Sequence, residues 1–266
     1  MKQYLLHAIR QLGLLNFADR VHYQVHRLAS FLANRRFTLR NPDYPVPTTK
    51  LAFEAYGHTS WDEYRCTGEK HAKLIADLVR EHAPGQNLNV LEWGCGSGRI
   101  IRHLKAMGLD AGASLSGVDV DKAAVNWCTK HLPQIRFQHS GSLPPLLFAD
   151  ASFDVIYHYS VWTHLSEDSL KEWMREIARL LKPNGIMIAT THGDHYVGLL
   201  LPHELERYRA GNAVMRTSYE EGRKYYLSFH PPDYVSCLLK QNYKGLRHIP
   251  SSQGHGIPQD VWIASK

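Results

Sequence analysis

The alternation of apolar and polar residues along the chain predicts an ordered series of strands and helices. Short apolar runs with the spacing of strands alternate with segments in which apolar residues recur every three or four positions. Such an alternation predicts a parallel, doubly wound α/β sheet, which binds ligands at the carboxyl ends of its strands. We expect a strand ending at Trp93 and further strands at 113–120, 135–138, 153–159 and 186–191, with helices at 121–131 and 166–181.

The first forty residues form a separate pattern. Residues 1 to about 33 carry apolar side chains near helical spacing with arginines between them, and Gly13 is expected to divide this helix into two. We favour a helical extension that packs on the main domain or on a second subunit, as in a homodimer. The alternative is peripheral contact of a basic amphipathic element with a membrane surface. A proline-rich connector at 41–47 separates this extension (1–40) from the main domain (41–266).

Two further segments flank the alternating region. An aromatic-rich stretch at 51–65 precedes a helix of about fifteen residues from Glu69. The aromatic residues of this stretch are equally consistent with packing in the core and with a lid over a flat ligand. After the fifth strand, an insertion at about 195–230 interrupts the pattern at the edge of the sheet where ligands bind. Because loops on a rigid scaffold carry specificity, we expect this insertion to be an acceptor lid. A helix at 231–239 and strands at 246–249 and 259–264 complete the chain.

A glycine-rich loop follows the first strand, with the sequence Gly94-Cys95-Gly96-Ser97-Gly98. Glycines let the backbone approach a ligand closely, and the helix expected to follow offers free N–H groups. The spacing is not the Gly-x-Gly-x-x-Gly of dinucleotide sites, and Glu92 before it would repel a pyrophosphate but suit an ammonium group. Asp119, about 20 residues beyond the glycines, lies where a carboxylate accepts hydrogen bonds from ribose hydroxyls. The sequence therefore predicts a nucleoside ligand without a pyrophosphate.

Composition narrows the possible partners. The chain has 266 residues, 44% of them hydrophobic, with a net charge of +6 and a pI near 9.1. Its basic residues form no stripe interleaved with aromatic residues, so we expect no nucleic acid partner. Four scattered cysteines predict reduced thiols in the cytoplasm, and no apolar run reaches the roughly 20 residues of a membrane span. We expect no metal site, since His22 and His26 lack a third ligand nearby.

Several motifs in order carry a resemblance to a known family. The glycine loop is followed by Gly117-Val118-Asp119, Ser152-Phe153-Asp154-Val155-Ile156, His164-Leu165 and 179–185 (RLLKPNG). This series resembles that of class I S-adenosylmethionine-dependent methyltransferases. Further motifs resemble a bacterial subgroup often associated with surface-glycan and secondary-metabolite biosynthesis; they are Tyr56-Gly57 with Tyr64 and Gly68, Pro144-Pro145-Leu146, 160–165 (SVWTHL) and Thr191-His192-Gly193.

The resemblance implies a Rossmann-like, doubly wound seven-stranded sheet closed by an antiparallel hairpin, with the helical extension and the lid added to it. It also implies S-adenosylmethionine as cofactor and S-adenosylhomocysteine as product. Glu92 would reach the amino group of the cofactor, Asp119 would hold the ribose and Val120 would pack on the adenine. The Asp or Asn that reads adenine in the family is replaced here by 139–142 (HSGS). The implied cofactor contacts are Glu92, Gly94, Cys95, Gly96, Asp119, Val120, Gly141, Ser142 and Tyr64.

The chemistry of methyl transfer asks little of the protein, because the methyl donor is already activated and positioning supplies most of the rate. A base is required only where the acceptor keeps its proton, as a hydroxyl does. The expected candidates at the carboxyl edge are His192, His164 and Tyr157, and we expect at most one of Tyr157 and Tyr159 to face the pocket. We expect methyl transfer to a small-molecule or sugar hydroxyl; the alternatives are an N-acceptor, or a cofactor-binding domain that serves as an assembly partner.

Overall fold

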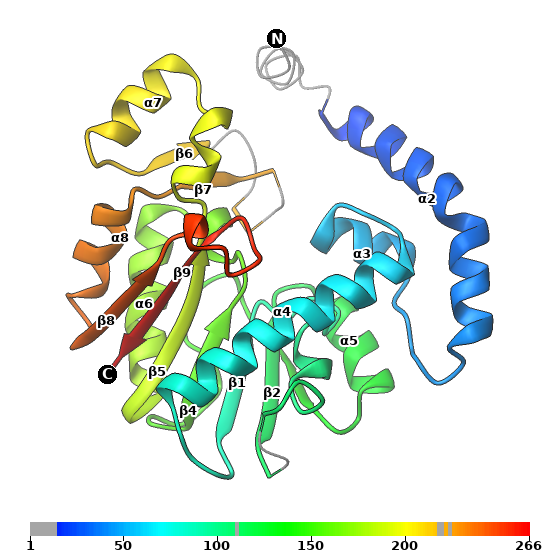
Figure 1. The fold of residues 1–266 in the computed structure, drawn as a ribbon, viewed down its shortest axis with the longest axis horizontal. Coiled ribbons are helices and arrows are strands. Elements are labelled where there is room, and N and C mark those ends of the chain that lie inside the picture. The colour runs from blue at the N-terminus through cyan, green and yellow to red at the C-terminus, as the bar shows by residue number, and fades with distance from the viewer. Residues whose placement is uncertain (1–14, 110–111, 217–220, 223–224) are drawn as a thin grey trace.

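The centre of the protein is a seven-stranded sheet, seen in a computed structural model that describes residues 15–109, 112–216, 221–222 and 225–266 (Figure 1). The strands lie in the order β3-β2-β1-β4-β5-β9-β8. Their bounds are β1 Asn89–Trp93, β2 Ser114–Asp119, β3 Arg136–His139, β4 Phe153–His158, β5 Leu181–Thr191, β8 Gly245–Ile249 and β9 Asp260–Ser265.

The first five strands run parallel, whereas β9 is antiparallel to both β5 and β8. This confirms the predicted doubly wound sheet and its closing antiparallel hairpin. Glu92 pairs with Gly117 on one side and with Tyr157 on the other, and Asp119 pairs with His139. The carboxyl ends of β1, β2, β3 and β4 therefore meet at one edge.

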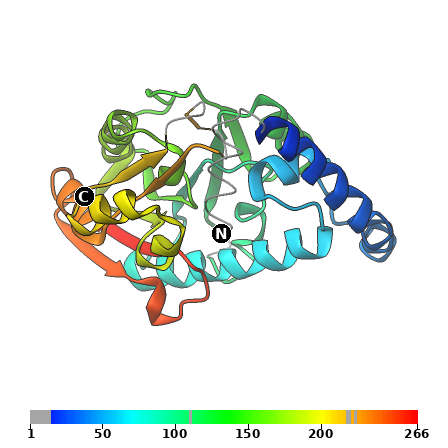
Figure 2. The same cartoon turned by 90° about the horizontal axis from the view of Figure 1, so that it is seen from above.

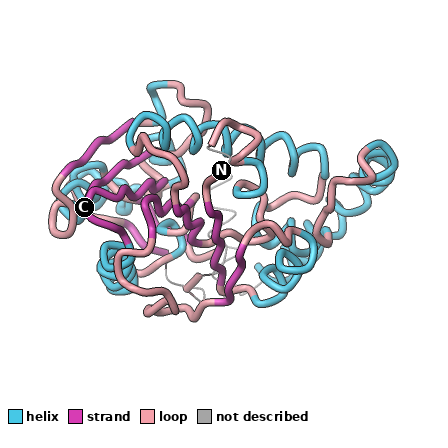
Figure 3. Tube along the Cα trace, turned by 90° about the horizontal axis from the view of Figure 1, so that it is seen from below, coloured by secondary structure: helices cyan, strands magenta, loops and turns pink. Residues whose placement is uncertain are grey.

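Helices cover both faces of this sheet, and Figure 3 shows the strands as a layer between them. On one face, α4 (Trp61–His82) buries Ile75 and Val79 in an aliphatic cluster. On the other face, α6 (Glu167–Leu180) buries Trp173 and Met174 beside α8 (Pro232–Leu239). The remaining helices are α2 (Leu15–Arg40), α3 (Thr49–Tyr56), α5 (Lys122–His131) and α7 (Pro202–Arg209).

Two helices in the N-terminal third are longer than the sequence pattern indicates. Helix α2 continues to Arg40, and the expected break at Gly13 lies outside the described residues. Helix α4 begins at Trp61, because the Ser60 side chain accepts a hydrogen bond from the Glu63 N–H and caps it there. Part of the aromatic stretch is thus helical, and its Trp61 and Tyr64 rings are buried with Phe37 of α2.

The segment after the glycine loop differs from the α-helix that we expected. Only a short 3-10 helix, Ile101–His103, follows the loop. Its first N–H group donates to the buried carboxylate of Glu92 at 3.2 Å, and the next bonds run from residue i to i−3. Similarly, β5 begins at Leu181, five residues before the expected start, because Lys182–Gly185 form an irregularity in its pairing with β4.

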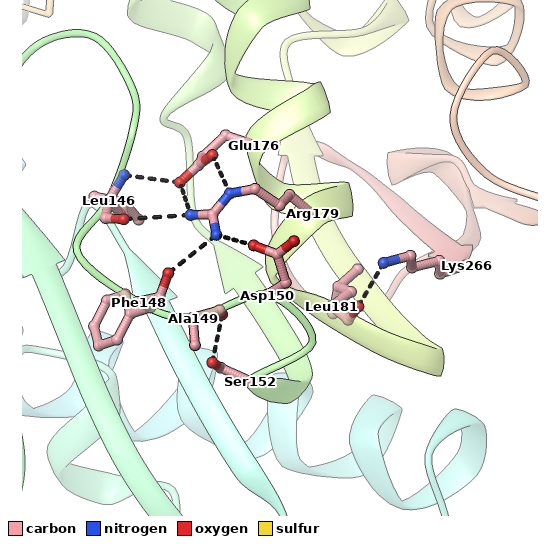
Figure 4. A network of polar contacts seen from close by, with 9 residues as sticks. All are labelled: Leu146, Phe148, Ala149, Asp150, Ser152, Glu176, Arg179, Leu181 and Lys266. Carbon is pink, nitrogen blue, oxygen red and sulfur yellow. Dashed lines mark hydrogen bonds and ion pairs between the residues drawn. The ribbon is translucent and has the colours of Figure 1, made fainter.

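A polar network fixes the loop between β3 and β4 (Figure 4). Arg179 of α6 donates to both carboxylate oxygens of Glu176, at 2.7 and 2.9 Å, and to the Phe148 carbonyl at 3.0 Å. Glu176 also accepts the Leu146 N–H at 2.7 Å. Since Glu176 is buried, these bonds hold the loop that leads away from the end of β3 in one place.

The predicted insertion has its own structure, with a 3-10 helix at Asp194–Leu199, then α7 and a hairpin of β6 (Val214–Arg216) and β7 (Leu227–Phe229). It has a small core of Leu200, Tyr208, Val214 and Phe229. Its hairpin is attached to the sheet edge, because Ser228 Oγ donates to the Trp162 carbonyl at 2.9 Å. Among the described helices, none is long and apolar enough to span a membrane.

Candidate functional site

The glycine loop is fixed to the end of β2. The N–H groups of Gly94 and Cys95 donate to the Val118 carbonyl at 2.8 and 3.0 Å, and the loop glycines have φ of 75° (Gly94), 51° (Gly96) and 70° (Gly98). A β-carbon at Gly94 would lie 2.3 Å from a methyl carbon of Val161. Glycine is therefore required there by both backbone conformation and space.

Asp119 and the loop lie together, as the sequence predicts. Its Oδ2 accepts the Gly96 N–H at 2.6 Å and its Oδ1 accepts the Asp121 N–H at 2.8 Å. Burial raises the pKa of the Asp119 carboxyl, although the two N–H donors favour its charged form. Each carboxylate oxygen has a second acceptor position, so this geometry leaves capacity for two hydroxyl donors.

A flat apolar surface and an unpartnered hydroxyl lie beside Asp119. The Val120 side chain is 46% exposed, and the Ser140 N–H donates to the Asp119 carbonyl at 3.0 Å. Gly141 and Ser142 are exposed, as ligand contacts require. The hydroxyl of Ser140 is buried without a hydrogen-bond partner in the described part of the chain, which the sequence analysis missed. Its position directly after β3 was the available signal.

Glu92 lies beneath the loop. Its side chain is buried, its Oε2 accepts the Ile101 N–H, and the Tyr157 hydroxyl faces it without a hydrogen bond of regular geometry. Burial raises the pKa of Glu92 to about 8, partly opposed by Tyr157 and by the nearby Arg99 cation. A contact between Glu92 and the amino group of a cofactor stays a prediction, as does the packing of Cys95, whose side chain is buried.

Helix α4 supports the loop from behind. The Tyr64 hydroxyl donates to the Ser97 carbonyl at 2.8 Å, and Tyr64 has no exposed surface. One turn further along, a β-carbon at Gly68 would lie 2.4 Å from the Arg99 carbonyl oxygen, so helix and loop are in close contact. This position indicates that Tyr64 positions the loop, and the contact with a cofactor that we expected of it stays a prediction.

Arg99 is a buried cation at the end of the loop that the sequence analysis did not single out. Its Nη1 donates to Thr67 at 3.0 Å and lies 3.1 Å from His71 Nδ1, and its guanidinium lies 4.4 Å from the centre of the Tyr56 ring. Its Nε has no partner among the described residues. Because a buried donor without an acceptor is costly, this arrangement favours an anionic ligand group near Nε.

The predicted histidines lie at the carboxyl ends of the strands. The Nδ1 atom of His192, after β5, lies 3.3 Å from the Ser228 carbonyl, and that of His164 lies 2.8 Å from the Tyr226 carbonyl. A carbonyl only accepts, so Nδ1 is the protonated nitrogen in both contacts. Burial lowers the pKa of His192 to about 4, so its imidazole is neutral at pH 7 with a lone pair on Nε2.

Two more histidines lie in this region. His158 ends β4 and contacts Trp162, while the His230 N–H donates to the His192 carbonyl at 2.9 Å. Both rings are buried, and in the described part of the chain none of their ring nitrogens has a hydrogen-bond partner. Burial lowers the pKa of each to about 3. The sequence analysis missed His230, because it follows the insertion and reaches the site only through the fold.

Tyr157 and Tyr159 lie on the same side of the sheet, and the expectation that at most one of them faces the pocket stays a prediction. Residues i and i+2 of a strand point to the same side, and both rings pack on the side covered by α4. Tyr157 is fully buried and burial raises its pKa well above 10, whereas Tyr159 stacks on His71 at 4.3 Å. This environment does not favour Tyr157 as a base.

Metal ligands do not gather in this region. Within the described ranges, no group of three or more His, Cys, Asp or Glu side chains is placed to hold a metal ion.

Comparison with known proteins identifies the type of domain. Residues 90–185 match the family model of a methyltransferase domain. A ubiquinone biosynthesis O-methyltransferase of Azorhizobium caulinodans is 26% identical over 162 residues, which cover 54% of this chain and 62% of that protein. The O-methyltransferase cnsE of Penicillium expansum is 26% identical over 195 residues, which cover 63% of this chain and 67% of that protein.

These likenesses differ in extent. The matches cover between 37% and 62% of the length of four curated relatives. An S-adenosylmethionine-bound amino pentose methyltransferase from Micromonospora echinaspora, involved in calicheamicin biosynthesis, has a TM-score of 0.56 at 14% identity, over 84% of this chain and 98% of that one. At this identity, the structural likeness shows the fold.

Proposed function

We propose that this chain, which matches a methyltransferase domain over residues 90–185, is a class I S-adenosylmethionine-dependent methyltransferase that transfers the methyl group of this cofactor to a hydroxyl of a sugar or another small molecule. The observation that carries the proposal is the pairing of Asp119 with the glycine loop through the Gly96 N–H, beside the exposed Val120. A carboxylate, a close backbone and an apolar surface suit a ribose, an aminoacyl chain and a purine, respectively.

The residues present fit this cofactor. In our proposal, Asp119 accepts hydrogen bonds from the ribose hydroxyls and the Ser140 hydroxyl, which has no partner of its own, meets the polar edge of the adenine next to Gly141 and Ser142. The glycine loop contacts the methionine part, and the Arg99 cation attracts its carboxylate. The bound cofactor supplies an activated methyl group, so the protein has to position the acceptor and exclude water.

The hydroxyl acceptor is proposed from the basic groups at the carboxyl edge. His192 is neutral at pH 7, and its Nδ1–H faces the Ser228 carbonyl, so Nε2 is left to take a proton. When the acceptor oxygen replaces sulfur on the methyl carbon, which would leave S-adenosylhomocysteine, His192 would receive the hydroxyl proton. The match to O-methyltransferases supports an oxygen acceptor. In this proposal the insertion at 195–230 binds the acceptor.

Calorimetry with the whole chain tests the cofactor assignment. We expect S-adenosylmethionine and S-adenosylhomocysteine to bind with dissociation constants at or below about 100 μM. We expect NAD neither to bind to the protein nor to compete with these two ligands. Binding of the cofactor without methyl transfer to any of a panel of sugars, alcohols and amines would favour an assembly partner. Transfer to amines alone would favour an N-acceptor, and no binding of either ligand would refute the proposal.

His192→Ala should lower the turnover number by about 10²–10⁴-fold, the usual contribution of a positioned base, while the dissociation constant of the cofactor stays within about twofold of wild type. His131→Ala is the matched control, because His131 is exposed at the C-terminal end of α5, outside the insertion, and it should keep full turnover. Release of S-adenosylhomocysteine with the best acceptor of the panel measures both. Undiminished turnover of His192→Ala would remove it as the base.

A further inference from the structure

Helix α2 exposes a continuous apolar surface that the domain does not cover. Its large apolar side chains are 47 to 75% exposed, and at 100° per residue most of them fall on one side of the helix. This apolar stripe consists of Phe17, Val21, Val25, Leu28, Phe31, Leu32 and Leu39. Scattered exposed apolar residues need no explanation, whereas a stripe over about six turns of helix does.

The opposite side of α2 is the one that packs on the domain. Asn34 accepts the Trp61 N–H at 2.9 Å and donates to the Thr59 carbonyl at 2.7 Å, and Phe37 is buried next to Trp61. The helix lies along the outside of the molecule, against α3 and α4 (Figure 1 and Figure 2). The helix is therefore held by specific contacts on its inner side, and its apolar stripe faces outward.

The charged residues on the outward side of α2 are all positive. The helix carries five arginines and a single acid, Asp19, which accepts a hydrogen bond from the Tyr225 hydroxyl of the insertion. On the helical wheel, Arg20 and Arg27 flank one border of the stripe and Arg36 flanks the other. Long arginine side chains at these borders can extend to phosphate groups while the apolar residues lie deeper.

We propose that α2 docks on an anionic lipid bilayer, with its apolar stripe at the boundary between headgroups and acyl chains. Helices that lie in the plane of such a surface combine a broad apolar side with flanking cations. Burial of the apolar side chains and attraction of the cations to anionic headgroups both contribute to the binding free energy. A second copy fits less well, because Arg35 lies within the stripe between Leu32 and Leu39. Pairing two such stripes would bring arginine-rich surfaces together without acids to neutralise them.

Sedimentation of the full chain with vesicles tests this proposal. We expect binding to vesicles of equal parts phosphatidylcholine and phosphatidylglycerol, weakening with added salt, and little binding to phosphatidylcholine alone. Arg20→Gln/Arg27→Gln should lower the partition constant by about fivefold per arginine removed. Leu28→Ser/Leu32→Ser should lower it by roughly tenfold or more.

Matched controls separate this surface from general effects of charge and apolarity. Leu147→Ser removes a leucine that is 82% exposed elsewhere, and Lys73→Gln/Lys240→Gln removes two exposed cations from other helices or their ends. Both should bind vesicles as wild type does. Equal binding to the two vesicle types, or loss of binding in the controls as large as in the α2 variants, would overturn the proposal. The proposal would also be overturned if the protein formed a dimer in solution that Leu28→Ser/Leu32→Ser dissociates, and if the protein bound neither type of vesicle.

Discussion

Lowering the pH from 7 to 5 is expected to remove most of the free energy of unfolding. Burial lowers the pKa of His71, His158 and His230 to about 3 and that of His103 and His192 to about 4. In the unfolded chain each titrates near 6.5, so between about pH 4 and 6.5 the unfolded state binds more protons. Each such imidazole then costs about 1.4 kcal/mol of stability per pH unit, which is large against a typical total of about 5–15 kcal/mol.

The buried carboxyls of Glu92 and Asp119, whose folded-state pKa values are both raised, act in the opposite direction. The folded-state pKa of Glu92 is raised to about 8, so its contribution is fully present below its unfolded pKa and is lost as the pH rises through 8. Five imidazoles outweigh these two carboxyls, and the net effect stays a loss of stability in acid. Urea unfolding at half-unit pH steps measures it.

Two histidine variants separate the contributions to this profile. His230→Asn should reduce the pH slope by about one proton, whereas His195→Asn, at an exposed position, should leave it unchanged. A free energy of unfolding that is flat between pH 5 and 7 would contradict the burial of these rings.

The fold could be predicted because its signals are local. Each strand and helix of the alternating region has its own apolar period, and Asp119 follows the glycine loop at a spacing that the pairing of β1 with β2 turns into contact. The lengths of α2 and α4 were less predictable. Their ends depend on Asn34 and on the Ser60 cap, which act through tertiary contacts or one side chain rather than through periodicity.

The histidine cluster could not be predicted, because it is assembled from distant parts of the chain. His158 ends β4, His192 follows β5, and His230 joins them only because β7 docks beside the end of β5. Arg99 was equally inconspicuous, since its significance lies in a buried Nε–H group that has no partner among the described residues. For Tyr157 and Tyr159 the sequence was informative, because residues i and i+2 of a strand point to the same side and both rings pack toward α4.

Asp119→Ala is expected to weaken the binding of S-adenosylhomocysteine by about 1.5–3 kcal/mol, or roughly 10- to 150-fold. Each oxygen of its carboxylate keeps an acceptor position for a ribose hydroxyl, and a charged acceptor makes the stronger kind of hydrogen bond. Calorimetry gives the dissociation constant directly. Asp121→Asn is the nearby control, because Asp121 caps α5 and its carboxylate accepts the N–H groups of that helix; the variant should bind within about threefold of wild type.

A loss in Asp119→Ala could also arise from the loop, since the same carboxylate holds the Gly96 N–H. The 2′,3′-dideoxy analogue of S-adenosylhomocysteine distinguishes the two causes. It lacks the hydroxyls that Asp119 would bind, but it uses the same loop. If Asp119 holds the ribose, the variant loses affinity for the natural product and keeps most of its weaker affinity for the analogue. Equal losses for both ligands would assign Asp119 to loop support alone, and unchanged affinity for both would place the ribose elsewhere.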